Sequence, residues 1–151
     1  MNIVVDSNIV FSALLNSSGN IGQLIINGKN HFHFYSISLL KDEIINHKEK
    51  LLRLSGFSEH QFQSAFHFIT SRITFVNDFL IPFKVVDHAL SLVKGIDEND
   101  ALFVALNNYL NARLWTGDKK LIFGLREKGY KKTVSTEELF EIFIFKQLSG
   151  R

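Results

Sequence analysis

The sequence predicts an α/β fold in which a mainly parallel β-sheet is covered by helices on both faces. Short apolar runs typical of strands alternate along the chain with segments whose apolar residues recur at helical spacing. The candidate strands are apolar throughout, as strands buried on both faces of a parallel sheet are. No repeat, linker or low-complexity tract interrupts this alternation, so we expect a single domain over residues 1–151.

The chain begins with a β-branched run, residues 2–6, which ends at the turn-like sequence DSN. Residues 9–15 then have apolar spacing at helical period. A second helical piece, residues 23–26, ends at Asn27-Gly28, which is a helix stop signal. Residues 33–37 have the composition of a second strand.

Polar residues at suitable positions predict the starts of the next helices. Ser38 is expected to cap a helix over residues 39–45. Ser58 begins the following helix with the capping-box pattern S-x-x-Q, and this helix runs to about Ser71. Residues 73–76 then form a short third strand.

The only proline, Pro82, precedes a helix whose apolar residues lie within 85–93, and Gly95 ends that helix. Asp97 is expected to cap a helix over residues 100–110.

The last third of the chain repeats the alternation. Residues 113–116 form a strand, residues 121–128 a helix and residues 133–134 a brief strand. Ser135 starts the final helix with a second capping-box pattern, S-x-x-E. The run LFEIFIF in this helix is apolar around nearly its whole circumference, so we expect part of it to meet another chain, most simply in a homodimer.

Composition narrows the class of protein. Hydrophobic residues make up 46% and charged residues 21%, as in folded globular proteins, which excludes disorder as the main state. Because Cys is absent, disulfides and thiolate metal sites are excluded, and a reducing cytoplasm is the simplest location. We expect no secretory signal and no membrane association, because the chain starts directly with a strand and lacks an apolar run of about 20 residues.

The net charge is only +2, but basic residues crowd one stretch: Lys119, Lys120, Arg126, Lys128, Lys131 and Lys132. Such a cluster suits the binding of a polyanion, and a solvated helix face is the simpler alternative.

Acidic residues follow several of the expected strands or begin expected helices. They are Asp6, Glu43, Asp97, Asp100 and Asp118. A lone Asp at such a place is more often a helix cap than a ligand. In parallel sheets, however, sites form at the carboxyl ends of strands, and these acids are expected at that edge. Clustered carboxylates either protonate or recruit cations, and oxygen ligands favour Mg²⁺ or Mn²⁺.

The segments VVDSNI, LLKDEI, DENDALFVAL and LWTGDKKL resemble, in order and spacing, the four acidic motifs of the PIN-domain nucleases. The resemblance extends from Met1 to about Glu141 and is most specific in the last two motifs. It implies a three-layer α/β/α sandwich. It also implies that Asp6, Glu43, Asp100 and Asp118 are the catalytic, metal-binding acids, with Asp97 as an additional metal-binding acid in part of the family.

Other positions of the motifs are also matched. Ser7 stands where the family usually has Thr, Asn8 matches its Asn, and Thr116 represents its polar residue before the last acid. We expect these three side chains to orient the carboxylates. Lys120 is a departure, since many relatives carry a further acid there, and whether one or two ions bind stays open.

The expected activity is hydrolysis of RNA phosphodiester bonds assisted by one or two Mg²⁺ or Mn²⁺ ions. Lys119 and Lys120, next to the last acid, are expected to contact the RNA. The resemblance also implies the toxin of a toxin–antitoxin pair, with an antitoxin protein as a partner. The alternative is a PIN-like module that binds RNA or protein without catalysis.

Other classes fit the sequence less well. A dinucleotide-binding domain would need glycines after the first strand, where DSNIVF has none. An aspartyl-nucleophile phosphatase would usually have an acid in place of Asn8. His31 and His33 have the spacing to share one side of a strand but lack a third ligand nearby, and the 15 Phe residues are more simply core than nucleic-acid platforms.

Overall fold

The computed structural model describes residues 1–150, and within this range five parallel strands form one sheet in the order β3-β2-β1-β4-β5. The strands are β1 (Asn2–Val5), β2 (His33–Ile37), β3 (Ile73–Val76), β4 (Arg113–Trp115) and β5 (Thr133–Val134). The predicted parallel sheet is confirmed, and β2, β3 and β5 have the predicted bounds. β1 and β4 each end one residue before the prediction, which leaves Asp6 and Thr116 just outside the sheet.

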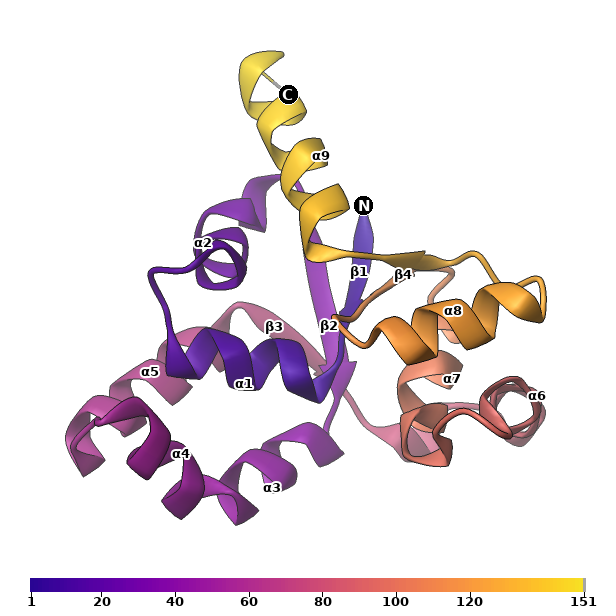
Figure 1. Ribbon diagram of the computed structural model, residues 1–151, viewed down its shortest axis with the longest axis horizontal. Coiled ribbons are helices and arrows are strands. Elements are labelled where there is room, and N and C mark those ends of the chain that lie inside the picture. The colour runs from indigo at the N-terminus through magenta and orange to yellow at the C-terminus, as the bar shows by residue number, and fades with distance from the viewer. Residues whose placement is uncertain (151) are drawn as a thin grey trace.

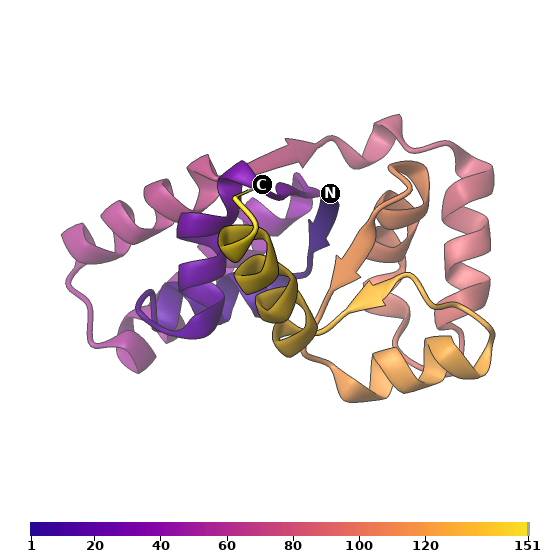
Figure 2. The same ribbon diagram turned by 90° about the horizontal axis from the view of Figure 1, so that it is seen from above.

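Helices cover both faces of this sheet, so the predicted three-layer α/β/α arrangement is confirmed (Figures 1 and 2). One layer contains α1 (Ser7–Leu15), α2 (Asn20–Asn27), α3 (Leu39–Asn46), α4 (Lys48–Ser55), α5 (Glu59–Ser71) and α9 (Thr136–Leu148). The other contains α6 (Phe83–Val93), α7 (Ala101–Tyr109) and α8 (Lys119–Glu127). Short 3-10 turns complete the described residues: η1 (Gly28–Asn30), η2 (Asp78–Leu80) and η3 (Glu98–Asp100).

The side chains of β1 show how one strand serves two cores. Ile3 and Val5 join the core beneath α1, α2 and α5, whereas Val4 joins the core beneath α6, α7 and α8. All three are fully buried. Alternate side chains of a strand point to opposite faces, so a strand between two helical layers must be apolar at every position.

The order of the strands places a switch point beside β1. The chain adds β2 and then β3 on one side of β1, and then returns through α6 and α7 to add β4 on the other side. Connections therefore diverge between the carboxyl ends of β1 and β4. Open α/β sheets form their sites in the crevice that this divergence opens.

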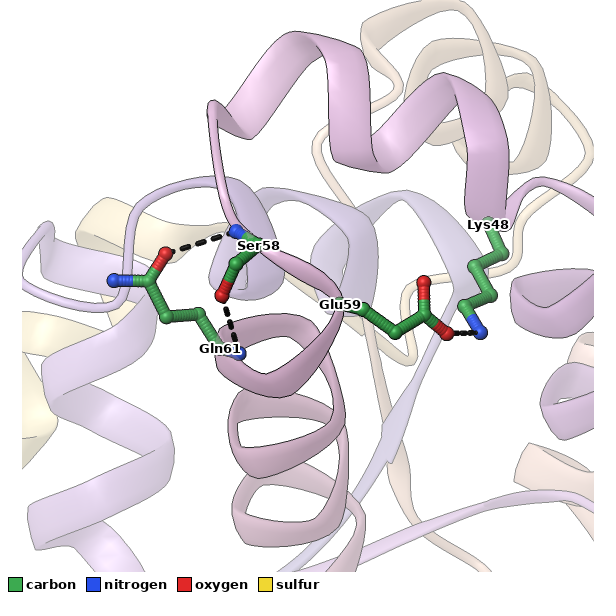
Figure 3. A network of polar contacts seen from close by, with 4 residues as sticks. All are labelled: Lys48, Ser58, Glu59 and Gln61. Carbon is green, nitrogen blue, oxygen red and sulfur yellow. Dashed lines mark hydrogen bonds and ion pairs between the residues drawn. The ribbon is translucent and has the colours of Figure 1, made fainter.

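Two of the predicted helix starts are confirmed in detail. Ser58 Oγ accepts from the N–H of Gln61 at 3.2 Å, and Gln61 Oε1 accepts from the N–H of Ser58 at 2.9 Å (Figure 3). Ser135 and Glu138 form the same reciprocal pair, with both contacts at 3.1 Å. These capping boxes satisfy backbone donors that the first turns of α5 and α9 would otherwise leave unpaired.

The prediction that Ser38 caps α3 is wrong. Its own backbone is already helical (φ −60°, ψ −31°), whereas a capping residue needs an extended backbone to turn its hydroxyl toward the first turn.

The sequence also predicts no element where α4 lies, and it predicts too short a helix at α2. Helix α4 begins directly after His47, without a residue that favours a helix start. It contributes Leu51 to the core, and Lys48 forms an ion pair with Glu59 at the start of α5 (Figure 3). Helix α2 begins at Asn20 with Gly19 at its N-cap position.

Among residues 1–150, no single helix is long and apolar enough to cross a membrane; α1 and α2 with η1 meet that test only as a pair, and they are bent by 101°.

Candidate metal centre

Asp6 stands at the carboxyl end of β1 and begins α1. Its N–H donates to the carbonyl of Trp115 in β4 at 3.3 Å, and its Oδ1 accepts from the N–H of Ile9 at 3.0 Å. The side chain is only 3% exposed. Burial raises the pKa of this carboxyl, and hydrogen bonds from Thr116 and from the N–H of Ile9 oppose the rise. Asp6 is thus a fixed carboxylate beneath the switch point.

Asp118 occupies the equivalent place after β4 and begins α8. Its Oδ1 accepts from the N–H of Leu121 at 3.1 Å. Its own N–H donates to the hydroxyl oxygen of Thr116 at 3.1 Å. Since Thr116 is fully buried and also hydrogen bonds to Asp6, one side chain fixes both strand-end acids relative to each other. The orienting role expected of Thr116 stays a prediction, and these contacts are compatible with it.

Asp97 and Asp100 approach from the loop between α6 and α7. Gly95, with φ +82°, ends α6 and turns the chain into this loop. Asp97 Oδ1 accepts from the N–H of Asn99 at 3.0 Å, so Asp97 caps η3. The helix predicted to begin at Asp100 begins at Ala101, and the residues before it form the 3-10 turn.

The carboxylates of Asp97, Asp100 and Asp118 lie within 4.8 Å of one another. Burial, and after it the neighbouring carboxylates of Asp97, Asp6, Asp118 and Glu43 in that order, together raise the pKa of Asp100 to about 7. The charge of each of the other four predicted acids therefore affects the pKa of Asp100. Segments far apart in the sequence thus bring the five carboxylates to one edge of the sheet.

Glu43 reaches this edge from α3. Burial raises the pKa of its carboxyl, while the nearby His47 and a hydrogen bond with the Ser7 side chain lower it. Ser7 is the first residue of α1, directly after Asp6. The hydroxyl at this position therefore links the second acidic motif to the first, and its expected role in orienting a carboxylate stays a prediction.

A pocket of about 600 Å³ opens beside these acids. Glu43, Asp97 and Asp100 line it together with Ser7 and Asn8. Apolar residues of four helices complete the lining: Phe11 of α1, Leu39 of α3, Val86 and Leu90 of α6, and residues 101–103 of α7. Asp6 and Asp118 are not among the described residues that line this pocket, although both carboxylates lie close enough to raise the pKa of Asp100.

The donor set fits a hard divalent cation. Every acid in the cluster offers carboxylate oxygen, which suits Mg²⁺ or Mn²⁺. A carboxylate has about four lone-pair positions, so the single backbone bond accepted by Asp97 or Asp118 leaves capacity for a cation. A cation would also offset the repulsion that raises the pKa of Asp100.

The basic stretch divides into two groups. Lys119 and Lys120 are exposed in the first turn of α8, directly after Asp118. Lys128, in contrast, donates to the carbonyls of Ser91, Leu92 and Lys94 at the end of α6, at 2.6 to 3.3 Å. Lys132 donates to Asn111 Oδ1 at 3.1 Å. Lys128 and Lys132 therefore stabilise the fold. The basic surface available to a polyanion is narrower than the six basic residues in the sequence suggest.

Two further residues beside the acids were missed in the sequence. Phe11 and His47 both line the pocket, and their rings are 5.9 Å apart at 85°. Phe11 follows Asn8 by about one helical turn, and His47 follows Glu43 in the same way, so their spacing from the acidic motifs was the available signal. His31, in contrast, lies before β2 and does not share a strand face with His33.

A family model of the PIN domain matches residues 4–139, which include all five acids. The chain belongs to the PIN-domain family. The resemblance carried by the four acidic motifs is thereby confirmed.

The PIN domain is also similar to a solved structure. VapBC2 from Rickettsia felis, bound to a DNA fragment from their promoter, matches with a TM-score of 0.65 and 16% sequence identity, over 89% of this chain and 97% of that chain. At this identity the likeness shows the fold alone. No curated protein matches the chain.

Proposed function

We propose that this PIN domain is a divalent-metal-dependent endoribonuclease. The observation that carries the proposal is the grouping of Asp97, Asp100 and Asp118 within 4.8 Å, next to the buried Asp6 and beside a pocket of about 600 Å³. So many carboxylates raise one another's pKa and destabilise the metal-free fold, and a cation removes that cost. Membership of the PIN-domain family supports the same function.

Each acid has a proposed role. Asp6, Asp97, Asp100 and Asp118 would hold one or two Mg²⁺ or Mn²⁺ ions, and Glu43 would complete the site from α3. Such an ion polarises a phosphodiester and lowers the pKa of an attacking water. Thr116 would hold the acids after β1 and β4 in place, and Ser7 would hold Glu43; their hydrogen bonds to these residues support both roles. Asn8, which lines the pocket, would orient a phosphate oxygen or a carboxylate.

RNA is the proposed substrate, and this preference comes from the family resemblance. Lys119 and Lys120 support it, because they place two exposed positive charges directly beside Asp118. A backbone phosphate near these lysines would lie within reach of the acid cluster.

We further propose a cytoplasmic toxin that acts as a single domain and is controlled by an antitoxin protein. The four acidic motifs support this through their resemblance to toxin nucleases. The similar fold of VapBC2, which is bound to a promoter fragment, is consistent with such a pair.

A homodimer through α9 is proposed as well. Leu139 is buried, and Phe140, Ile142 and Phe143 pack against the core, but Phe145 and Leu148 are 70% and 84% exposed. Light scattering at micromolar concentration should show a dimer that Phe145→Glu dissociates. Phe123→Glu, which changes an equally exposed residue of α8, should leave the dimer intact. A monomeric wild-type protein would exclude the dimer.

Cleavage assays test the proposed activity. Purified protein should cleave single-stranded RNA with Mg²⁺ or Mn²⁺, and a chelator should stop it. Glu43→Gln should reduce the rate, whereas Asp42→Asn, which removes the exposed acid next to it on α3, should not. Binding of RNA without cleavage under any divalent ion would instead identify a non-catalytic PIN-like module.

A further inference from the structure

A second pocket, of about 260 Å³, lies between α1 and α4 and continues from the acid-lined pocket. Asn8, Phe11 and His47 line both. The smaller pocket is therefore an extension of the candidate active site along the surface. A substrate whose phosphate lies at the acids would place the next group along its chain in the smaller pocket.

The rings of Phe11 and His47 form the junction between the two pockets, and their positions are fixed. Phe11 lies in the middle of α1 and packs partly against the core. His47 stands at the joint between α3 and α4, where its N–H donates to the carbonyl of Glu43 at 3.1 Å. The rings meet edge to face, with centroids 5.9 Å apart at 85°. The ring pair therefore lines the region shared by the two pockets, beside Glu43.

The remaining lining has the chemistry of a nucleotide-binding surface. Leu15, Leu51 and Leu54 form an apolar wall, and Lys50 adds a positive charge at the rim. The volume lies just below the roughly 300 Å³ at which pockets for drug-sized ligands begin, so it suits one planar ring. An aromatic and apolar slot with a cation beside it complements a base and its flanking phosphate.

We propose that this pocket binds the base of an unpaired nucleotide next to the scissile phosphate, stacked on the ring pair of Phe11 and His47. The proposal rests on the proposed function, since it places the phosphate at the acid cluster. It makes single-stranded RNA the substrate, because the bases of a duplex are already stacked and paired. His47 is then a positioning residue that acts through its ring.

Calorimetry with small probes tests the base without requiring cleavage. In the presence of Mn²⁺, uridine and adenosine 5′-monophosphate should bind the wild-type protein about tenfold more tightly than ribose 5-phosphate. This ratio corresponds to about 1.4 kcal/mol, at the low end of base–aromatic stacking. His47→Ala and Leu54→Ala should each remove the preference, and His47→Phe should keep it. His67→Ala, at an exposed position of α5, should change nothing.

Cleavage kinetics then test positioning. With a short single-stranded RNA, His47→Ala should raise KM about tenfold and leave kcat within about twofold, and His47→Phe should restore KM. Melting temperatures close to that of the wild type would exclude a folding defect. Rescue by His47→Lys but not by His47→Phe would overturn the proposal, because charge rather than a ring would then be needed.

The two proposals can fail separately. A preference for nucleotides over ribose 5-phosphate in a protein that cleaves no RNA would refute the nuclease and support the base pocket. Cleavage with equal binding of all three probes, and with KM unchanged in His47→Ala, would refute the base pocket. The pocket would then be assigned to a side chain of a protein partner.

Discussion

Two kinds of helix cap follow the strands of this sheet, and they differ in charge. Ser135 follows β5 and caps α9, whereas Asp6 and Asp118 follow β1 and β4 and cap α1 and α8. All three accept one backbone N–H at 3.0 to 3.1 Å, so each satisfies the same local need. A neutral serine is therefore sufficient for capping at this edge.

The aspartate caps add a charge that capping does not require. They lie with Asp97 and Glu43 around Asp100, whose pKa rises to about 7 through burial and then through these neighbours. Comparable Ser and Asp caps contribute similar stability, so the repulsion is an added cost. The difference between the caps indicates which helix starts serve the fold alone and which also serve a site.

The largest expected effect comes from Asp6→Asn. The amide keeps the size and most hydrogen bonds but removes one charge from the cluster. RNA cleavage should fall by more than about 100-fold, beyond the loss typical of residues that merely support metal ligands. The melting temperature in chelator should stay equal or rise, because like-charge repulsion is relieved. Asp87→Asn, an exposed acid of α6, is the control, and full activity of Asp6→Asn would contradict the assignment.

A second effect concerns pH. Asp100 has a higher pKa in the folded protein, about 7, than in the unfolded chain, about 3.9. Between these values the folded state binds more protons, so the free energy of unfolding must fall as pH rises. Burial raises the pKa of Asp6 and Glu43 too, which gives the same sign.

Thermal melting of the metal-free protein from pH 4 to pH 7 measures this dependence. Asp100→Asn should flatten it, and Mg²⁺ or Mn²⁺ should raise the melting temperature of the wild type most near and above pH 7, where protons no longer compete. A wild-type melting temperature that rises steadily over this range in chelator would contradict the repulsive cluster.

Replacing a serine cap should have effects opposite to those of Asp6→Asn: stability should fall and cleavage should be unaffected. Ser135→Ala should lower stability by about 1 kcal/mol, or about 2–4 °C in melting temperature, because a first-turn N–H of α9 loses its acceptor. Cleavage per folded molecule should stay unchanged. A loss of activity as large as that of Asp6→Asn would remove the distinction between the two kinds of cap.

The smallest expected effect comes from the charges in the first turns of α8 and α9. Helix α9 begins with Glu137 and Glu138, which suit the helix dipole, whereas α8 begins with Lys119 and Lys120, which oppose it. Replacing both lysines by Ala should slightly stabilise the fold, by about 0.3 kcal/mol or more, yet weaken RNA binding. The salt dependence of binding should lose about 0.7 in slope per lysine. Lys29→Ala, on η1, should leave the slope unchanged, and an equal loss there would refute a specific role.

The sequence was sufficient to predict the features that depend on local patterns. Short runs rich in β-branched and aromatic residues predicted the bounds of β2, β3 and β5, and the S-x-x-Q and S-x-x-E patterns predicted the starts of α5 and α9. The five acids could be assigned to one sheet edge because strand ends in a parallel sheet share that edge.

Features that depend on tertiary packing were not predictable in this way. Helix α4 is strongly charged and begins after His47 without a favourable cap, and its contact with the core through Leu51 stabilises it. Lys128 looked like part of a basic track, but its target is a set of carbonyls on α6, more than 30 residues away. The contact between Phe11 and His47 likewise joins two helices whose crossing the sequence does not specify.

Calorimetric titration of Mn²⁺ tests most directly whether the acids form a cation site. Wild-type protein should bind one or two ions, and Asp100→Asn should weaken binding at least about tenfold, or about 1.4 kcal/mol, since Asp100 interacts with all four other acids. Asp42→Asn should bind as the wild type does. Equal Mn²⁺ affinity in Asp100→Asn and Asp42→Asn, or no binding to the wild type, would show that these carboxylates only cap helices.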